Sequence, residues 1–229
     1  MQPLWLLDSI GSRLIIDEQQ AFSDLSISSF GNYFLQLGIW GRSNTFTHKT
    51  HIKNCFLIAT HSFAEIDLVA DLDRLPLQDQ AVDVIFLPHT LEQHSNHQDI
   101  LSASANAINE GGALIALGFN PVSLWGLRYW FSGKEFLSGM KRLISVNQYT
   151  HWLVDFGFRV EKIHYFHAII PQRKRYELSL KNGMFNPFLC ACYMITARKE
   201  MIPLTLEKQF IKGKRQKTSL ADSMGRMTI

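Results

Sequence analysis

The sequence predicts an α/β fold with a doubly wound, mostly parallel sheet. Three apolar runs support this prediction, and each leads into a loop of the kind that lines a cofactor crevice: 69–76, 82–89 and 110–117. Apolar runs without polar alternation are typical of parallel strands covered by helices on both faces. Ligands of such sheets bind beyond the carboxyl ends of the strands. We therefore expect a nucleotide-type site at these loops.

Length and composition agree with one sizeable core. The chain has 229 residues, of which 46% are apolar, enough for a single domain over residues 1–205. Apolar stretches end well before eighteen residues, so we predict neither a transmembrane span nor a secretory signal. Cys55, Cys190 and Cys192 lie inside apolar runs, which favours reduced core residues and a cytoplasmic protein.

The positive charge is concentrated at the C-terminal end. Residues 206–229 carry six Lys or Arg against Glu207 and Asp222, a net of 6 − 2 = +4, so the total of +3 leaves 3 − 4 = −1 for the rest. A nearly neutral body argues against a nucleic-acid-binding face. The segment 206–229 is predicted to be a basic, disordered tail, with contact to RNA or a membrane as the alternative.

The N-terminal half begins with a helical segment over residues 1–30. Residues 12–29 have the apolar spacing of an amphipathic helix. Four buried strands are expected after it. They cover 33–37, 55–59, 66–71 and 82–89, and Gly38 closes the first.

The C-terminal half alternates helices and strands. A helix over 98–109 stops at Gly111 and Gly112, and a helix over 148–156 stops at Gly157. The strands are expected at 113–119, 159–168 and 189–197, and Pro203 ends the ordered part. Residues 121–147 form an aromatic insertion after the fifth strand, which we expect to hang over the site as a lid.

Several motifs resemble the type 11 family of class I S-adenosylmethionine-dependent methyltransferases. They are the acidic Leu-Pro run 71–77, Val82-Asp83-Val84 and the run 89–92. The runs 118–128 and 197–205 resemble the YafS-like branch of that family. The resemblance covers residues 30–205 and implies a Rossmann-like doubly wound sheet of about seven strands with an antiparallel last strand.

The resemblance also implies a site. S-adenosylmethionine would be the cofactor, and its contacts would be Gly38, Trp40, Gly41, Thr60, Asp71, Leu72 and His89. Asp71 would accept the adenine amino group, although a role as a cap of the next turn is the alternative. Leu72 would offer its backbone N–H and an apolar contact.

The chain departs from the family pattern in its first half. Only the first glycine of the expected G-x-G-x-G loop is present, and Trp40 stands in place of the second. Thr60 and His61 follow the second strand, where the family has a carboxylate for the ribose hydroxyls. About six residues separate Thr60 from the third strand, too few for a crossover helix, so the adenosine-side half is expected to be shortened.

His89 is the candidate catalytic base, because it ends the fourth strand and a histidine titrates near neutrality. A histidine hydrogen-bonded to its loop is the alternative, and Thr90 and Glu92 are weaker candidates. His89, His94 and His97 lack a carboxylate or cysteine that would complete a tetrahedral site, so we predict no metal.

The expected function is methyl transfer from S-adenosylmethionine to a small, apolar acceptor. The rival is a non-catalytic protein of the same fold, in which the ring of Trp40 fills the cleft and the surface binds a partner. The lid aromatics, which include Trp125, Trp130 and Phe131, would cover the core, line an acceptor pocket or contact a membrane surface.

Overall fold

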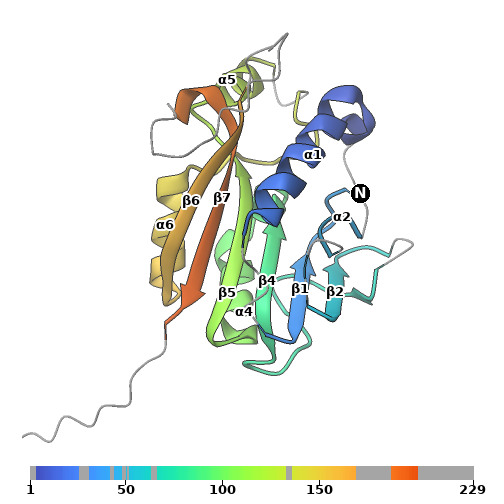
Figure 1. The fold of residues 1–229 in the computed structure, drawn as a ribbon, viewed down its shortest axis with the longest axis vertical. Coiled ribbons are helices and arrows are strands. Elements are labelled where there is room, and N and C mark those ends of the chain that lie inside the picture. The colour runs from blue at the N-terminus through green and yellow to red at the C-terminus, as the bar shows by residue number, and fades with distance from the viewer. Residues whose placement is uncertain are drawn as a thin grey trace, which may run out of the picture.

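Seven strands form one sheet in the order β3-β2-β1-β4-β5-β7-β6 (Figure 1). The structure, a computed structural model, describes residues 4–25, 31–41, 44–47, 50, 52–62, 66–132, 136–168 and 187–200. Strand β7 is antiparallel to β5 and β6, and the other neighbours are parallel. The predicted fold class is confirmed. The strands are β1 (Tyr33–Leu37), β2 (Asn54–Ala59), β3 (Leu68–Val69), β4 (Val82–Pro88), β5 (Ile108–Phe119), β6 (Phe158–Ala168) and β7 (Cys190–Lys199).

Helices cover both faces of the sheet. Helix α1 crosses one face, while α4 and α6 lie on the other (Figure 1). Helix α1 begins three residues before the predicted start and ends at Ser23, and residues 26–29 of the prediction lie outside the described residues. The helices are α1 (Ser9–Ser23), α2 (Asn44–Thr47), α3 (Thr90–Gln93), α4 (His97–Ala107), α5 (Leu124–Phe131) and α6 (Val146–Asp155), with short 3-10 turns η1 (Leu4–Leu7) and η3 (Pro187–Leu189).

The alternation of side chains along β4 divides the core into two layers. Val84 and Phe86 face the layer under α1, where the ring of Phe86 lies 4.8 Å from that of Phe22. Ile85 and Leu87 face the layer under α4 and α6. Both layers are buried, which explains why the β4 sequence is apolar at almost every position.

Strand β5 is longer than its sequence predicts. It starts at Ile108, where a helix was expected to continue, and its pairing with β4 changes register between Val82 and Val84. Gly111 has a φ of 73°, a conformation that L side chains rarely adopt. This change of register accommodates Ile108 and Asn109, which the sequence suggested were the end of a helix, within the strand.

Strand β3 is a short edge. Its ladder to β2 joins only Ile58 with Leu68 and Ala59 with Val69, and the connection spans residues 60–67. Beside this ladder, the carboxylate of Asp67 accepts a hydrogen bond of 2.7 Å from the backbone N–H of Leu57. The adenosine-side half of the sheet is therefore short, as the sequence predicts. Strand β3 is four residues shorter than the predicted span 66–71.

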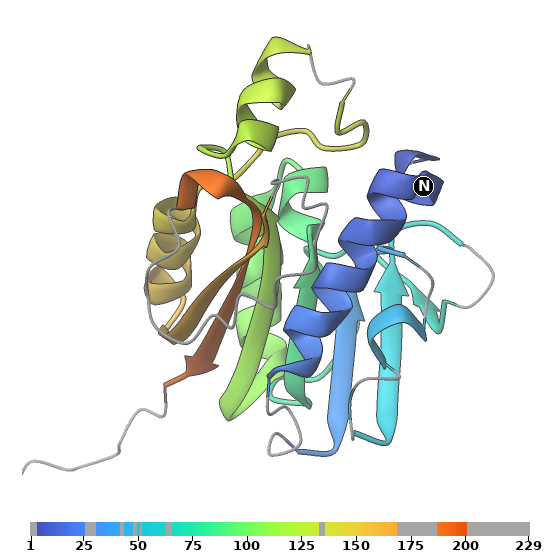
Figure 2. The same ribbon diagram turned by 45° about the horizontal axis from the view of Figure 1, so that its top comes forward.

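The insertion after β5 contributes helix α5, which stands beyond the end of the sheet in Figure 2. None of the described helices is long and apolar enough to cross a membrane. The predicted tail at 206–229 lies outside the described residues.

Candidate functional site

A cavity of about 470 Å³ lies at the carboxyl ends of the first three strands. This volume lies within the range of roughly 300–1,000 Å³ of small-molecule sites. Two other hollows, of about 260 and 390 Å³, lie beside α4 and beside Gly111, away from these strand ends. The cavity is lined by Gly38, Ile39, Ala59, Thr60, His61, Asp71, Leu72, Gln93, His94, Gly139 and Lys141.

Four of the seven predicted cofactor contacts line this cavity. They are Gly38 after β1, Thr60 after β2, and Asp71 and Leu72 after β3. Asp71 is exposed and supplies the one carboxylate among the lining residues, whereas Leu72 is 2% exposed. The sequence prediction that these strand ends meet at one edge therefore agrees with where the structure places them.

Gly38 has a backbone conformation that suits a close approach to a ligand. Its φ is 91°, and a Cβ at this position would lie 3.1 Å from the Thr90 hydroxyl oxygen. Thr90 is held in place because its hydroxyl donates to the Leu37 carbonyl. A side chain at residue 38 would thus be strained as well as crowded.

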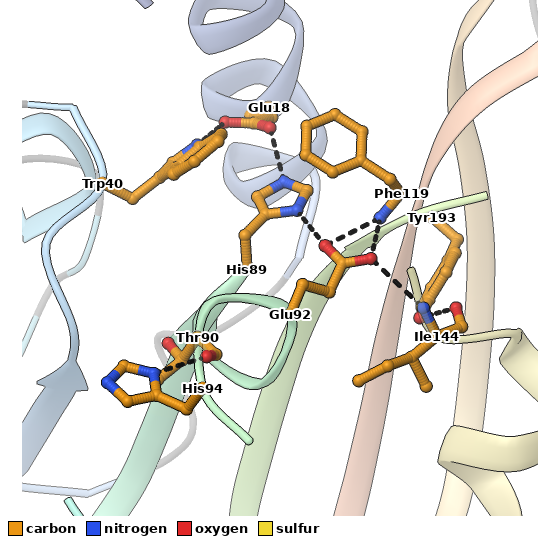
Figure 3. Close-up of polar contacts among 9 residues, drawn as sticks. All are labelled: Glu18, Trp40, His89, Thr90, Glu92, His94, Phe119, Ile144 and Tyr193. Atoms are coloured by element: carbon orange, nitrogen blue, oxygen red, sulfur yellow. Dashed lines mark hydrogen bonds and ion pairs between the residues drawn. The ribbon is translucent and has the colours of Figure 1, made fainter. Parts of the chain in front are cut away.

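The ring of Trp40 does not line the cavity. It is fully buried, and its indole N–H donates a hydrogen bond of 2.6 Å to Oε2 of Glu18 on α1 (Figure 3). Its ring lies 4.4 Å from that of His89 and 6.1 Å from that of Phe119. Trp40 therefore belongs to the core layer under α1, and Gly41, at φ 71°, turns the chain after it without reaching the cavity lining.

His89 lies between two buried carboxylates. Its Nε2 is 2.9 Å from Oε1 of Glu18, and its Nδ1 is 2.7 Å from Oε2 of Glu92 (Figure 3). The side chains of His89, Glu18 and Glu92 are at most 1% exposed. We call these three residues the buried triad.

Charges in the buried triad keep His89 protonated. Burial alone would lower the pKa of His89, but hydrogen bonds to Glu18 and Glu92 and their negative charges raise it to about 9. Burial also raises the pKa of Glu92. Because both pKa values are raised, the proton between His89 and Glu92 stays bound to the triad at pH values around 7. An imidazolium with both nitrogens engaged has no lone pair to accept a proton. His89 is not in the lining of the cavity either, so this geometry does not suit the predicted base.

Glu92 ties the triad to the insertion. Its carboxylate accepts the backbone N–H of Phe119 at 3.0 Å and of Ile144 at 3.5 Å, and its carbonyl accepts the N–H of Lys141 at 2.7 Å. Glu92 therefore fixes the end of β5 and the segment that carries two of the cavity-lining residues. The sequence suggested only a weak catalytic role or a cap for Glu92.

Glu18 was missed by the sequence analysis. It lies on the buried face of α1, in register with Leu14, Ala21 and Phe22. A carboxylate at an apolar position of an amphipathic helix needs a buried partner. That mismatch is the signal that could have identified it.

The three histidines near β4 lie in different environments. His89 is in the buried triad, His94 lines the cavity, and His97 stacks on Trp152 with ring centres 5.5 Å apart. Among the described residues, potential metal ligand atoms meet at Glu18, His89 and Cys192, within 4.8 Å of one another. Burial raises the pKa of Cys192 well above its usual value, so it remains a thiol, and Nε2 of His89 is already bonded to Glu18.

One ring nitrogen of His94, Nε2, has no hydrogen-bond partner among the described residues. Its Nδ1 is 2.8 Å from the Thr90 carbonyl, and because a carbonyl only accepts, Nδ1 carries the hydrogen. In the neutral ring Nε2 is then unprotonated and can accept a proton. Beside it, Nε2 of Gln93 is buried without a hydrogen-bond partner among the described residues. Of these two atoms, Nε2 of His94 is a proton acceptor on a cavity-lining residue, and Nε2 of Gln93 is a buried donor.

Comparison with known proteins gives consistent results. A family model described as a methyltransferase domain matches residues 49–116. The protein YafS of Escherichia coli K12 is 30% identical over 161 residues, which are 70% of this chain and 65%, less than two thirds, of YafS. The fold is similar to that of a SAM-dependent methyltransferase from Archaeoglobus fulgidus (TM-score 0.63, 17% identity, 82% of this chain and 95% of that chain). A second one, from Thermotoga maritima, has a TM-score of 0.65 and 19% identity over 86% of this chain and 93% of that chain.

Proposed function

We propose that this chain is a class I methyltransferase of the type 11 family, which uses S-adenosylmethionine as its cofactor and transfers a methyl group to a small, apolar acceptor. The observation that carries the proposal is the 470 Å³ cavity at the ends of β1, β2 and β3. The residues around it suit the cofactor, because the carboxylate of Asp71, the backbone of Gly38 without a Cβ and the apolar side chain of Leu72 line the same cavity.

The cofactor would be held by residues from all three strand ends. In this proposal Asp71 accepts the adenine amino group, Leu72 contacts the ring, and Thr60 with His61 faces the ribose. Gly38 and Ile39 face the methionine part. Bound there, S-adenosylmethionine supplies a methyl group on a positively charged sulfur.

The protein would contribute alignment, exclusion of water and a place for a proton. Methyl transfer is an in-line displacement, so the acceptor must be oriented and freed of water. If the acceptor loses a proton, we assign Nε2 of His94 to receive it, because this nitrogen is unprotonated in the neutral ring and its residue lines the cavity. His89 then has the role of a positioning residue within the buried triad.

The rival function is a non-catalytic binding module. It required Trp40 to occupy the cleft, whereas the indole is hydrogen-bonded to Glu18 and packed under α1. That arrangement favours cofactor binding over a filled cleft. The proposed reaction takes place in the cytoplasm, which the free thiols of Cys55, Cys190 and Cys192 support.

The test is a calorimetric titration of the purified protein with S-adenosylmethionine and S-adenosylhomocysteine. We expect both to bind, more weakly than to a relative with a ribose carboxylate by roughly tenfold to a hundredfold, because a pair of hydrogen bonds is lost. Transfer is then checked by incubating the protein with methyl-labelled cofactor and a small-molecule cell extract. Binding without a labelled product would leave cofactor binding without the proposed transfer. No heat at millimolar cofactor would exclude the proposed methyltransferase and favour the binding module with a filled cleft.

A further inference from the structure

Helix α5 carries an apolar surface that is exposed in the described part of the chain. Two of its side chains are among the most exposed large apolar groups of the described residues, Trp130 at 72% and Phe131 at 84%. The exposed apolar side chains of this region, which we call the α5 patch, are Val122, Leu124, Leu127, Trp130 and Phe131.

The opposite side of α5 fixes the helix to the body. Trp125 lies 5.1 Å from the ring of Phe136 and stacks on Phe119 at 6.2 Å. The Tyr129 hydroxyl donates to the Met140 carbonyl at 3.2 Å, and the Ser123 hydroxyl caps the first turn. The α5 patch therefore faces outward on an anchored helix, and its exposure is a built feature of the structure.

Helix α5, which carries the patch, stands beyond the end of the sheet (Figure 2). A projecting helix with Trp, Phe and Leu on its outer side is typical of elements that enter the boundary between lipid headgroups and acyl chains. Trp is also enriched at that depth in membrane proteins, because its ring is apolar with one polar group.

The insertion that carries the patch is positively charged. Residues 119–150 contain four basic side chains and one acidic one, a net of 4 − 1 = +3, whereas the rest of residues 1–205 carries −1 − 3 = −4. Among the described residues, Arg128, Lys141 and Arg142 are exposed, and the Arg128 guanidinium lies 4.2 Å above the ring of Phe136. Such charges attract anionic lipid headgroups.

From these observations we propose that α5 docks this protein on an anionic phospholipid bilayer. Leu127, Trp130 and Phe131 enter the interface, while Arg128, Lys141 and Arg142 contact the headgroups. Because Lys141 also lines the cavity, docking places the cavity next to the bilayer. The proposal stands independently of methyl transfer.

The test is co-sedimentation of the full chain with vesicles of phosphatidylcholine and with vesicles that also contain phosphatidylglycerol. We expect binding to the second kind only, weakened by salt. The double variant W130A/F131A should bind roughly tenfold or more weakly, because two large apolar side chains leave the interface. The matched control I16A/V154A removes exposed apolar side chains from α1 and α6 (61% and 60% exposed) and should bind like the wild type.

Three results would overturn the proposal. One is failure of the wild type to bind phosphatidylglycerol vesicles. Another is equal binding of W130A/F131A and the wild type, which would assign the binding to other basic parts of the chain. The third is self-association without vesicles, seen by light scattering and abolished in W130A/F131A, which would make the α5 patch a contact between copies of the chain.

Discussion

The ring of Trp40 packs against the imidazole of His89, with their centroids 4.4 Å apart, and neither ring lines the cavity. Both residues come from loops at the cofactor edge, yet both side chains enter the core layer under α1. Glu18 bonds to each of them, at 2.6 Å and 2.9 Å. One helix thus holds the two loops that the sequence assigned to cofactor contact.

Replacing Trp40 by Gly should destabilise the fold and leave cofactor affinity no higher. The change removes a fully buried ring, and large-to-small changes of this kind cost about 3–5 kcal/mol. Urea unfolding and calorimetry with S-adenosylhomocysteine measure both effects. Trp130→Gly, at an exposed helix position, should cost only about 1 kcal/mol. Tenfold tighter binding by Trp40→Gly would instead support a blocked cleft.

Asp71→Ala should weaken binding of S-adenosylhomocysteine by about tenfold to a hundredfold, because a carboxylate that accepts a hydrogen bond is lost. Asp73→Ala is the matched control. Asp73 accepts a hydrogen bond from Asn96 at 2.8 Å and does not line the cavity. Calorimetry compares the two variants, and equal losses would mean that the adenine site is misplaced.

The buried triad should make stability depend on pH. The pKa of His89 is raised to about 9 in the fold, against about 6.5 in the unfolded chain. Its contribution is therefore complete below pH 6.5 and is lost as the pH rises towards 9 and beyond, on the order of a few kcal/mol. Denaturant unfolding between pH 6 and 10 should show this fall, and His151→Gln, at an exposed site, should preserve it.

The same prediction can be checked at the residue itself. One imidazole signal in NMR should titrate near pH 9 and should disappear in His89→Gln. If every histidine signal titrates below pH 7, His89 is not held between two carboxylates in solution.

His94→Ala should lower methyl transfer without weakening cofactor binding. Loss of a general base typically costs about a hundredfold to ten-thousandfold in rate. The labelled product from the extract assay gives the rate, and calorimetry gives the affinity for S-adenosylhomocysteine. His97→Ala is the control, because His97 stacks on Trp152 outside the cavity. An unchanged rate in His94→Ala would contradict this role of His94. It would mean that solvent takes the proton or that the acceptor has none to lose.

The sequence predicted the strand positions and the edge where the cavity lies, because apolar runs and glycine stops depend on local patterns. It could not predict where the side chains of Trp40 and His89 point. His89 has a left-handed backbone at φ 54°, which turns its ring out of the direction expected for a strand end. The partner that receives it, Glu18, is 71 residues away in the chain, and no local pattern connects the two.

The short β3 edge has a consequence for how molecules of this protein meet one another. Because the ladder to β3 covers only two residues of β2, the outer edge of residues 54–56 has no strand partner among the described residues. The side chains of Phe56 and Val69 at this edge are exposed. Open strands of this kind can recruit a strand from another chain and start aggregation. The carboxylate of Asp67 accepts a hydrogen bond from the backbone N–H of Leu57, and the backbone N–H of Asp67 donates to the Leu57 carbonyl. One residue thus makes the boundary of the sheet a poor template for a further strand.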